Sequence, residues 1–215
     1  MLSSAQAMDV VIFGAGGLGR EIYDTLLTIN AHGPAYNVRG FIDDVKAPGT
    51  TVNGLPVLGG SAALEAMHGK VGVILGISLS ELRKKLHQKY RGNFTFPNII
   101  HPSTLVSSFA TLGEAILIQS NCVVAANATV GDGAMMNAHS GVGHDARVGE
   151  YCSIMSYCDL AGGVVLGESS FVGTGSKIIP STTIAPNSYL CAGAVVFKDV
   201  LVASKMMGNP ARIIG

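Results

Sequence analysis

Aliphatic residues recur at every sixth position along the second half of the chain. The series runs without a slip through Val106, Leu112, Ile118, Val124, Val130, Met136, Val142, Val148, Ile154, Leu160, Leu166, Val172, Ile178, Ile184, Leu190, Val196 and Val202. The residue four places later is mostly small, and the residue directly after is often glycine, which permits turn conformations that other residues resist. A period of six fits neither a helix nor a simple alternating strand, and it indicates a repeat architecture.

Each six-residue unit predicts a short strand with one inward aliphatic side chain, followed by a corner. Three units would form one triangular coil, and stacked coils would pair as parallel strands about 4.8 Å apart. A single coil cannot bury its inward side chains, so stacking is what stabilises the structure. The pattern therefore predicts a parallel β-helix of roughly five coils, and it leaves the handedness open.

A glycine-rich motif dominates the first part of the chain. Residues 9–15 (DVVIFGA) predict a buried strand, and residues 20–27 predict a helix. Between them lies a GxGxxG motif that includes Gly14, Gly16 and Gly17. Such a turn lets the backbone approach a phosphate, which the helix N-terminus attracts. The same motif also occurs as a tight strand-to-helix turn without a ligand, so both interpretations stand.

Acidic residues follow the next predicted strand. Residues 38–42 predict a strand that ends at Asp43 and Asp44, roughly 25 residues after the glycine motif, where a dinucleotide-binding domain places the acid that contacts a ribose. The other predicted elements are helices at 61–68 and 79–90 and strands at 71–76 and 96–100. About three strand–helix units suit a mononucleotide, because a dinucleotide domain has two such halves.

Composition narrows the classes of partner. The 215 residues carry no formal net charge, only 13% of them are charged, and the mean hydropathy is +0.41. No basic patch predicts nucleic-acid binding, and no run of about 18 apolar residues predicts a membrane span. The first seven residues, MLSSAQA, are too short and too polar for a secretory signal. We therefore expect a cytoplasmic protein that binds neither nucleic acid nor membrane.

The four cysteines do not predict a metal site. Cys122, Cys152 and Cys158 occupy small inward positions of the repeat, and Cys191 directly follows Leu190. None of them forms a CxxC pair, so we expect reduced thiols and no bound metal.

The segment from Asn137 to Asp145 (NAHSGVGHD) carries the candidate chemistry. His144 is the third residue of its repeat unit, so its side chain points outward near a corner. An imidazole with a pKa near neutrality suits a general base, and Asp145 beside it would orient the ring. A surface histidine beside an acid is the alternative. Asn137 is a candidate for holding an acceptor or an ordered water, and His139 for a surface or subunit contact.

These features together resemble a known enzyme family. The repeat [LIV]-G-x-x-[small]-x is similar to that of the hexapeptide acyltransferases, and with the segments GAGGLGRE, FIDD, VILGIS, IIHPS, NAHSGVGHD and GNPAR the chain resembles the PglD/NeuD-type sugar acetyltransferases. The resemblance implies an α/β Rossmann-like half domain at residues 8–101 that binds a nucleotide sugar. It also implies a left-handed parallel β-helix at residues 102–215, usually trimeric. Family members often carry histidine where this chain has Leu18.

The resemblance also implies roles for particular residues. Phosphate would contact Gly14, Gly16 and Gly17, and the nucleotide would lie near Asp43 and Asp44. His144 and Asp145 would supply the base, and the amide of Gly162 would stabilise the oxyanion. The pantetheine arm of acetyl-CoA would lie along Gly173 and Thr174. The possible partners of the CoA phosphates are Lys177, Lys198, Lys205 and Arg212.

The function expected from these observations is acetyl transfer to a sugar. A cytoplasmic homotrimer with active sites between subunits would use acetyl-CoA, without metal, to N-acetylate a nucleotide-linked amino sugar. A 4-amino-4,6-dideoxyhexose on a pathway to bacterial surface glycans is the specific expectation. O-acetylation of a sugar such as sialic acid is the enzymatic alternative. A nucleotide-sensing or structural β-helix without catalysis is the alternative of another class.

Overall fold

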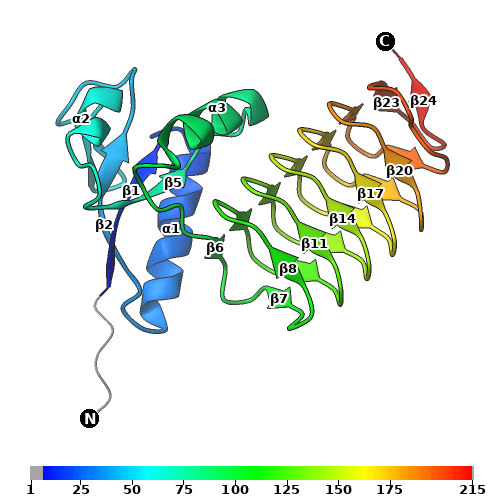
Figure 1. The fold of residues 1–215 in the computed structure, drawn as a ribbon, viewed down its shortest axis with the longest axis horizontal. Helices are drawn as coiled ribbons and strands as arrows, with labels where there is room; N and C mark the ends of the chain where they lie inside the picture. The colour runs from blue at the N-terminus through cyan, green and yellow to red at the C-terminus, as the bar shows by residue number, and fades with distance from the viewer. Residues whose placement is uncertain (1–6, 215) are drawn as a thin grey trace. The chain divides into compact units, whose positions relative to one another are not determined.

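The computed structural model describes residues 7–214, and the chain divides into two compact units between Ile99 and Ile100 (Figure 1). The expectation that the first seven residues form no secretory signal falls almost entirely outside the described residues. The predicted fold class, a Rossmann-like α/β unit followed by a parallel β-helix, is confirmed.

The first unit is a five-stranded sheet with the strand order β3-β4-β2-β1-β5 and three helices. Strands β4, β2, β1 and β5 are parallel, and β3 pairs with β4 in the antiparallel sense. The middle of β1 is completely buried, which explains its uninterrupted apolar sequence. The elements are β1 (Met8–Phe13), α1 (Gly17–Ala31), β2 (Tyr36–Ile42), β3 (Thr51–Val52), β4 (Leu55–Gly59), α2 (Ser61–Glu65), β5 (Gly72–Leu75) and α3 (Ser80–Tyr90).

The hairpin of β3 and β4 was missing from the predicted elements. Its turn is made by Asn53 and Gly54, which have positive φ angles of 48° and 81°. An Asn-Gly pair between apolar residues is a strong hairpin signal, because both central residues of a type I′ turn need positive φ. The sequence therefore contained the information for this element.

The second unit is a parallel β-helix whose coils stack in three ladders (Figure 1, green to red). Partners within a ladder are 18 residues apart, as in the pairing of Val124 with Val142. The first ladder contains β7 (Leu105–Val106), β10 (Val123–Val124), β13 (Gly141–Val142), β16 (Asp159–Leu160), β19 (Lys177–Ile178) and β22 (Val195–Val196). The second contains β8 (Thr111–Leu112), β11 (Thr129–Val130), β14 (Arg147–Val148), β17 (Val165–Leu166) and β20 (Thr183–Ile184). The third contains β6 (Ile99–Ile100), β9 (Leu117–Ile118), β12 (Met135–Met136), β15 (Ser153–Ile154), β18 (Phe171–Val172), β21 (Tyr189–Leu190), β23 (Lys205–Met207) and β24 (Arg212–Ile213).

The inward series follows the prediction except at its ends. Every predicted inward residue from Ile118 to Val196 is buried, and Val106 and Leu112 on the first coil are half-buried. The prediction is wrong at Val202, which is 74% exposed. Ile184 bridges Val200 instead, so the last coil is two residues shorter than the others and Val200 takes the inward place.

The glycines that follow the aliphatic residues have a different role from the predicted one. The residues with positive φ stand two places further on, as at Asn127, Asp145 and Gly163. Gly143 instead permits close stacking, because a Cβ there would lie 2.6 Å from the backbone nitrogen of Gly162 on the next coil. The fourth residue of each unit thus makes the corner, and the second lets neighbouring coils approach.

The shortened last coil gives a test with two identical substitutions. We expect Val200→Ala to lower the free energy of unfolding by about 1–3 kcal/mol, because it removes two buried methyl groups. Val202→Ala should change it by less than about 0.5 kcal/mol, because an exposed side chain loses little packing. The midpoint of chemical unfolding, followed by circular dichroism, measures both. A larger loss for Val202→Ala would contradict the shortened coil.

Candidate active site

His144 and Asp145 lie at a corner of the β-helix between β13 and β14. Asp145 has a φ of 59°, and its N–H donates to the carbonyl of Ala126 on the preceding coil, at 3.0 Å. The carbonyl of His144 accepts from the N–H of Gly163 on the following coil, at 2.8 Å. The backbone of this corner is therefore held from both sides.

The two side chains form a hydrogen-bonded pair at the surface. Nδ1 of His144 lies 2.8 Å from Oδ2 of Asp145, and the side chains are 73% and 59% exposed. Hydrogen bonds from His144 and then Asn127 hold the pKa of Asp145 below its usual value, so this carboxylate is ionised at neutral pH. An ionised acceptor at Nδ1 favours the tautomer whose lone pair is on Nε2. The pair can therefore accept a proton at Nε2.

Gly162 lies against the imidazole, one coil further along the same corner. A Cβ at Gly162 would lie 2.5 Å from Nε2 of His144, so only glycine lets the ring take this position. Among the described residues, no carbonyl accepts a hydrogen bond from the N–H of Gly162. The structure thus brings His144, Asp145 and Gly162 together, with a free amide beside the base.

Gly173, Thr174 and Asn137 lie at a different corner of the β-helix. Thr174 is 30 residues from His144, which is one coil and two further repeat units, so it cannot stack above His144. The N–H of Gly173 donates to the carbonyl of Leu190 at 2.8 Å and so belongs to a ladder. Oδ1 of Asn137 is buried and has no hydrogen-bond partner among the described residues. Within one chain the structure does not bring these three residues to His144.

The other predicted histidine contact is an aromatic stack. His139 lies at the same corner as Asn137, and its ring is parallel to that of Tyr157 on the next coil, with centroids 4.9 Å apart. Both residues are exposed. This is a surface contact, as one reading of the sequence proposed.

The glycine motif forms the turn between β1 and α1. Gly14 has a φ of 103°, and a Cβ at Gly19 would collide with the carbonyl of Gly14, so these two positions need glycine for conformation and close packing. Gly16 and Gly17 are exposed, and a Cβ at Gly16 would meet nothing within 4 Å. The first N–H groups of α1 have no partner within the helix, which makes this turn a site for an anion.

A cavity of about 420 Å³ opens beside this turn. Its lining residues are Ala15, Gly16, Arg20, Lys46, Thr51, Val52 and Asn53. Arg20 and Lys46 are cations that the sequence reasoning missed, although each lies within a few residues of a motif that it used. Together with the helix N-terminus, they make this cavity suitable for a phosphate-bearing ligand.

Asp43 and Asp44 hold the loops around this cavity. Oδ2 of Asp43 accepts from the N–H of Ala15, and Oδ1 accepts from those of Val45 and Lys46, each at 2.9 Å. Burial raises the pKa of Asp43, but the three N–H donors outweigh it and the pKa is lowered. Asp44 accepts from the N–H and hydroxyl of Ser61 at 2.6 and 2.9 Å, at the start of α2. Neither carboxylate lines the cavity.

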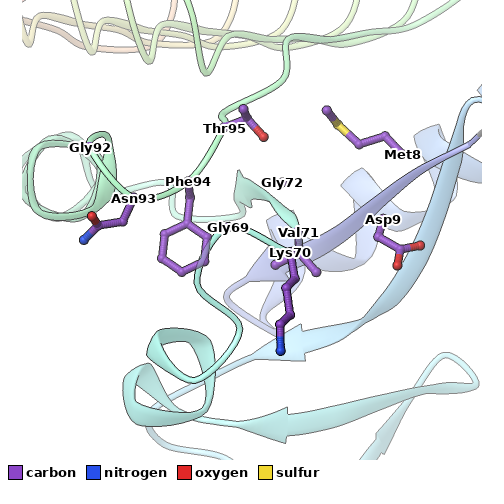
Figure 2. Close-up of a pocket in the computed structure, with 10 residues that line it drawn as sticks. All are labelled: Met8, Asp9, Gly69, Lys70, Val71, Gly72, Gly92, Asn93, Phe94 and Thr95. Atoms are coloured by element: carbon purple, nitrogen blue, oxygen red, sulfur yellow. The ribbon is translucent and has the colours of Figure 1, made fainter.

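A second hollow lies at the opposite edge of the same sheet (Figure 2). It has a volume of about 410 Å³ and surrounds the first residues of β1 and β5, with Asp9 and Lys70 on its rim. Ligands of open α/β sheets bind at the carboxyl ends of the strands, where the strand order reverses. This rule favours the cavity at the glycine motif.

The predicted partners of the CoA phosphates are divided between two places. Lys198 and Arg212 line a cavity of about 950 Å³ that follows β22 and includes Phe197 and Leu201. Nζ of Lys177 instead donates to the carbonyl of Tyr157 at 3.4 Å, and Nζ of Lys205 lies over the Tyr189 ring at 5.6 Å.

Two further searches cover only residues 7–214. This part of the chain contains no group of three or more histidine, cysteine, aspartate or glutamate side chains that could hold a metal ion. None of its helices is long and apolar enough to cross a membrane.

Comparisons with known proteins agree with this division into two units. Residues 9–90 match the family profile described as the PglD N-terminal domain. PerB of Caulobacter crescentus, solved with CoA and GDP-perosamine, is 34% identical, with a TM-score of 0.89 over 96% of this chain and 97% of that one. The acetyltransferase domain of PglB from Neisseria gonorrhoeae, solved with acetyl coenzyme A, is 26% identical, with a TM-score of 0.89 over 97% of this chain and 100% of that one.

Two other similarities cover different extents of the chain. WeeI of Acinetobacter baumannii is 26% identical, with a TM-score of 0.86 over 97% of this chain and 100% of that one. Among curated proteins, a candidate acetyltransferase of Saccharomyces cerevisiae is 37% identical over 51 residues, which span 24% of this chain and 26% of the yeast protein. The near-complete match to PerB at this identity decides the family. The chain belongs to the hexapeptide-repeat sugar acetyltransferases of the PglD/NeuD type.

Proposed function

We propose that this protein transfers the acetyl group of acetyl-CoA to the amine of a nucleotide-linked amino sugar. The observation that carries the proposal is the corner where Nε2 of His144 lies against the backbone of Gly162, with Asp145 bonded to Nδ1. A base, its orienting carboxylate and a free N–H within one corner suit acyl transfer. PerB and PglB, which were solved with CoA and with acetyl coenzyme A, support the choice of donor.

The reaction follows from these three groups. The amine attacks the thioester carbonyl, a C–N bond forms, and His144 takes the proton that the nitrogen loses. Asp145 stabilises the resulting imidazolium, and the N–H of Gly162 donates to the oxyanion of the tetrahedral intermediate. The intermediate collapses, the C–S bond breaks, and His144 returns its proton to the CoA sulfur. The inward cysteines are buried, so the amine attacks acetyl-CoA directly.

A second copy of the chain would complete the site. Asn137, Gly173 and Thr174 lie at a different corner from His144, so they can act on the same substrates only from a neighbouring subunit. We therefore propose a homotrimer with active sites between subunits, in the cytoplasm where acetyl-CoA is made available. Its product would serve the synthesis of surface glycans.

The glycine-motif cavity would hold the nucleotide. The turn at Gly14, Gly16 and Gly17 offers free N–H groups, and Arg20 and Lys46 add two positive charges at the cavity wall. A nucleoside diphosphate matches this arrangement. The cavity beyond β22, with Lys198 and Arg212, would take the phosphate-bearing end of CoA.

Release of CoA from acetyl-CoA tests the function directly. We expect turnover with one of a panel of UDP-, dTDP- and GDP-linked 4-amino sugars, and a loss of about 10²- to 10⁴-fold in kcat for His144→Ala. Turnover of free sialic acid alone would replace the proposal with O-acetylation. Full activity of His144→Ala would remove the proposed base.

A methyl group at Gly162 tests the position of the imidazole. Gly162→Ala keeps the N–H but places a Cβ at the ring, so we expect kcat to fall at least about tenfold while KM for both substrates changes little. Gly141→Ala is the matched control, because a Cβ there would only meet Asp159 at an ordinary 3.6 Å. Equal kinetics for the two variants would contradict the proposed ring position.

Loss of one cation tests the nucleotide cavity. Arg20→Ala should raise KM for the nucleotide sugar about tenfold without changing KM for acetyl-CoA, because it removes a charged contact to phosphate. Arg39→Ala removes an exposed arginine that pairs with Asp9 on β1, at 3.5 Å, and should leave both KM values unchanged. Steady-state kinetics with each substrate varied in turn gives the comparison, and an unchanged sugar KM in Arg20→Ala would contradict the site.

A further inference from the structure

Asn127 contacts the catalytic pair from the preceding coil. It lies between β10 and β11, 18 residues before Asp145, and both residues have a φ of 59°. Nδ2 of Asn127 lies 3.3 Å from Oδ1 of Asp145, while Oδ2 of the same carboxylate is bonded to His144. Three side chains therefore form a continuous hydrogen-bonded chain across one corner.

We propose that Asn127 is a positioning residue for acetyl transfer, which orients the carboxylate of Asp145 and through it the imidazole of His144. The inference rests on the proposed function, because it assigns to Asn127 an effect on the base of that reaction. Asn127 does not contact the reacting atoms in this role.

The exposure of the pair is the reason that such a residue is needed. A carboxylate that is 59% exposed, next to an imidazole that is 73% exposed, has no packed neighbours to fix its rotation. The amide of Asn127 engages Oδ1, which leaves Oδ2 directed at Nδ1 of His144. A fixed acceptor at Nδ1 keeps the lone pair on Nε2, where the proton must be taken. The same donor contributes to the lowered pKa of Asp145.

Backbone conformation alone would also favour asparagine at this corner, since asparagine tolerates positive φ. Asn187 separates the two explanations. It has the same φ of 59° and is exposed at another corner, and no described residue accepts a hydrogen bond from its side chain. The conformational requirement is common to both residues, and the bond to Asp145 is specific to Asn127.

Glycine substitutions at the two asparagines form a matched pair, because glycine adopts positive φ without strain. We expect Asn127→Gly to lower kcat about threefold to tenfold with KM for both substrates unchanged, as for the loss of one hydrogen bond to a charged group at the surface. Asn187→Gly should keep the parent kcat. Asn127→Asp, which keeps the size but replaces the donor with a charge that repels Asp145, should be at least as slow as Asn127→Gly.

A double-mutant cycle shows whether Asn127 acts through Asp145. In a chain that carries Asp145→Gly, Asn127→Gly should cause no further loss of kcat, because its acceptor is absent. An equal loss in the two backgrounds would mean that Asn127 supports the corner itself, and would overturn the inference. Melting temperatures of the two glycine variants check that their folds are equally intact.

His144→Ala, measured in parallel, keeps the two hypotheses distinct. Full activity of His144→Ala would refute the proposed base, whatever the behaviour of Asn127. Loss of activity in His144→Ala, together with equal kcat for Asn127→Gly and Asn187→Gly, would refute the positioning role alone.

Discussion

Stacking of inward aliphatic side chains at intervals of 18 residues is the constraint on which the β-helix depends. A coil of this size has no interior of its own, so each of Val124, Val142 and Leu160 is buried by the coils above and below it. Because a ladder pairs in only one register, residues that share a place in successive coils become neighbours in space. Asn127, Asp145 and Gly163 are aligned in this way, as are His144 and Gly162. Side chains that are distant in sequence thus meet without any special loop.

Much of the fold was predictable because the repeat encodes it directly. The period gave the coils, and the offset between His144 and Gly162 predicted their contact correctly. The register could not be extended to Val202, because the last coil has no full coil above it and closes two residues early, with Val200 inward. Local geometry at the corners was also hidden. Glycine suggested a turn, whereas its function at Gly143 is to let the next coil approach.

The first unit was harder to interpret because its side chains compete for the same backbone groups. Asp43 and Asp44 follow a strand at the distance expected for ribose ligands, yet both use their oxygens on the N–H groups of neighbouring loops. That choice depends on where Ala15 and Ser61 lie in space, which no local pattern records. Arg20 and Lys46 carried the opposite error, since isolated charges near a motif look like solvated surface until the cavity places them on one wall.

The number of coils has a consequence for the spacing of the sites in the second unit. Val142, Leu160, Ile178 and Val196 belong to four consecutive coils of one ladder, so the corner of His144 and the cavity beyond β22 are separated by three coil spacings, about 14 Å along the axis. Inserting or deleting 18 residues between them would change this separation in steps of about 4.8 Å without disturbing either end. A solenoid of this kind can therefore match its length to a long co-substrate by duplication of whole coils, whereas a globular core would have to be repacked.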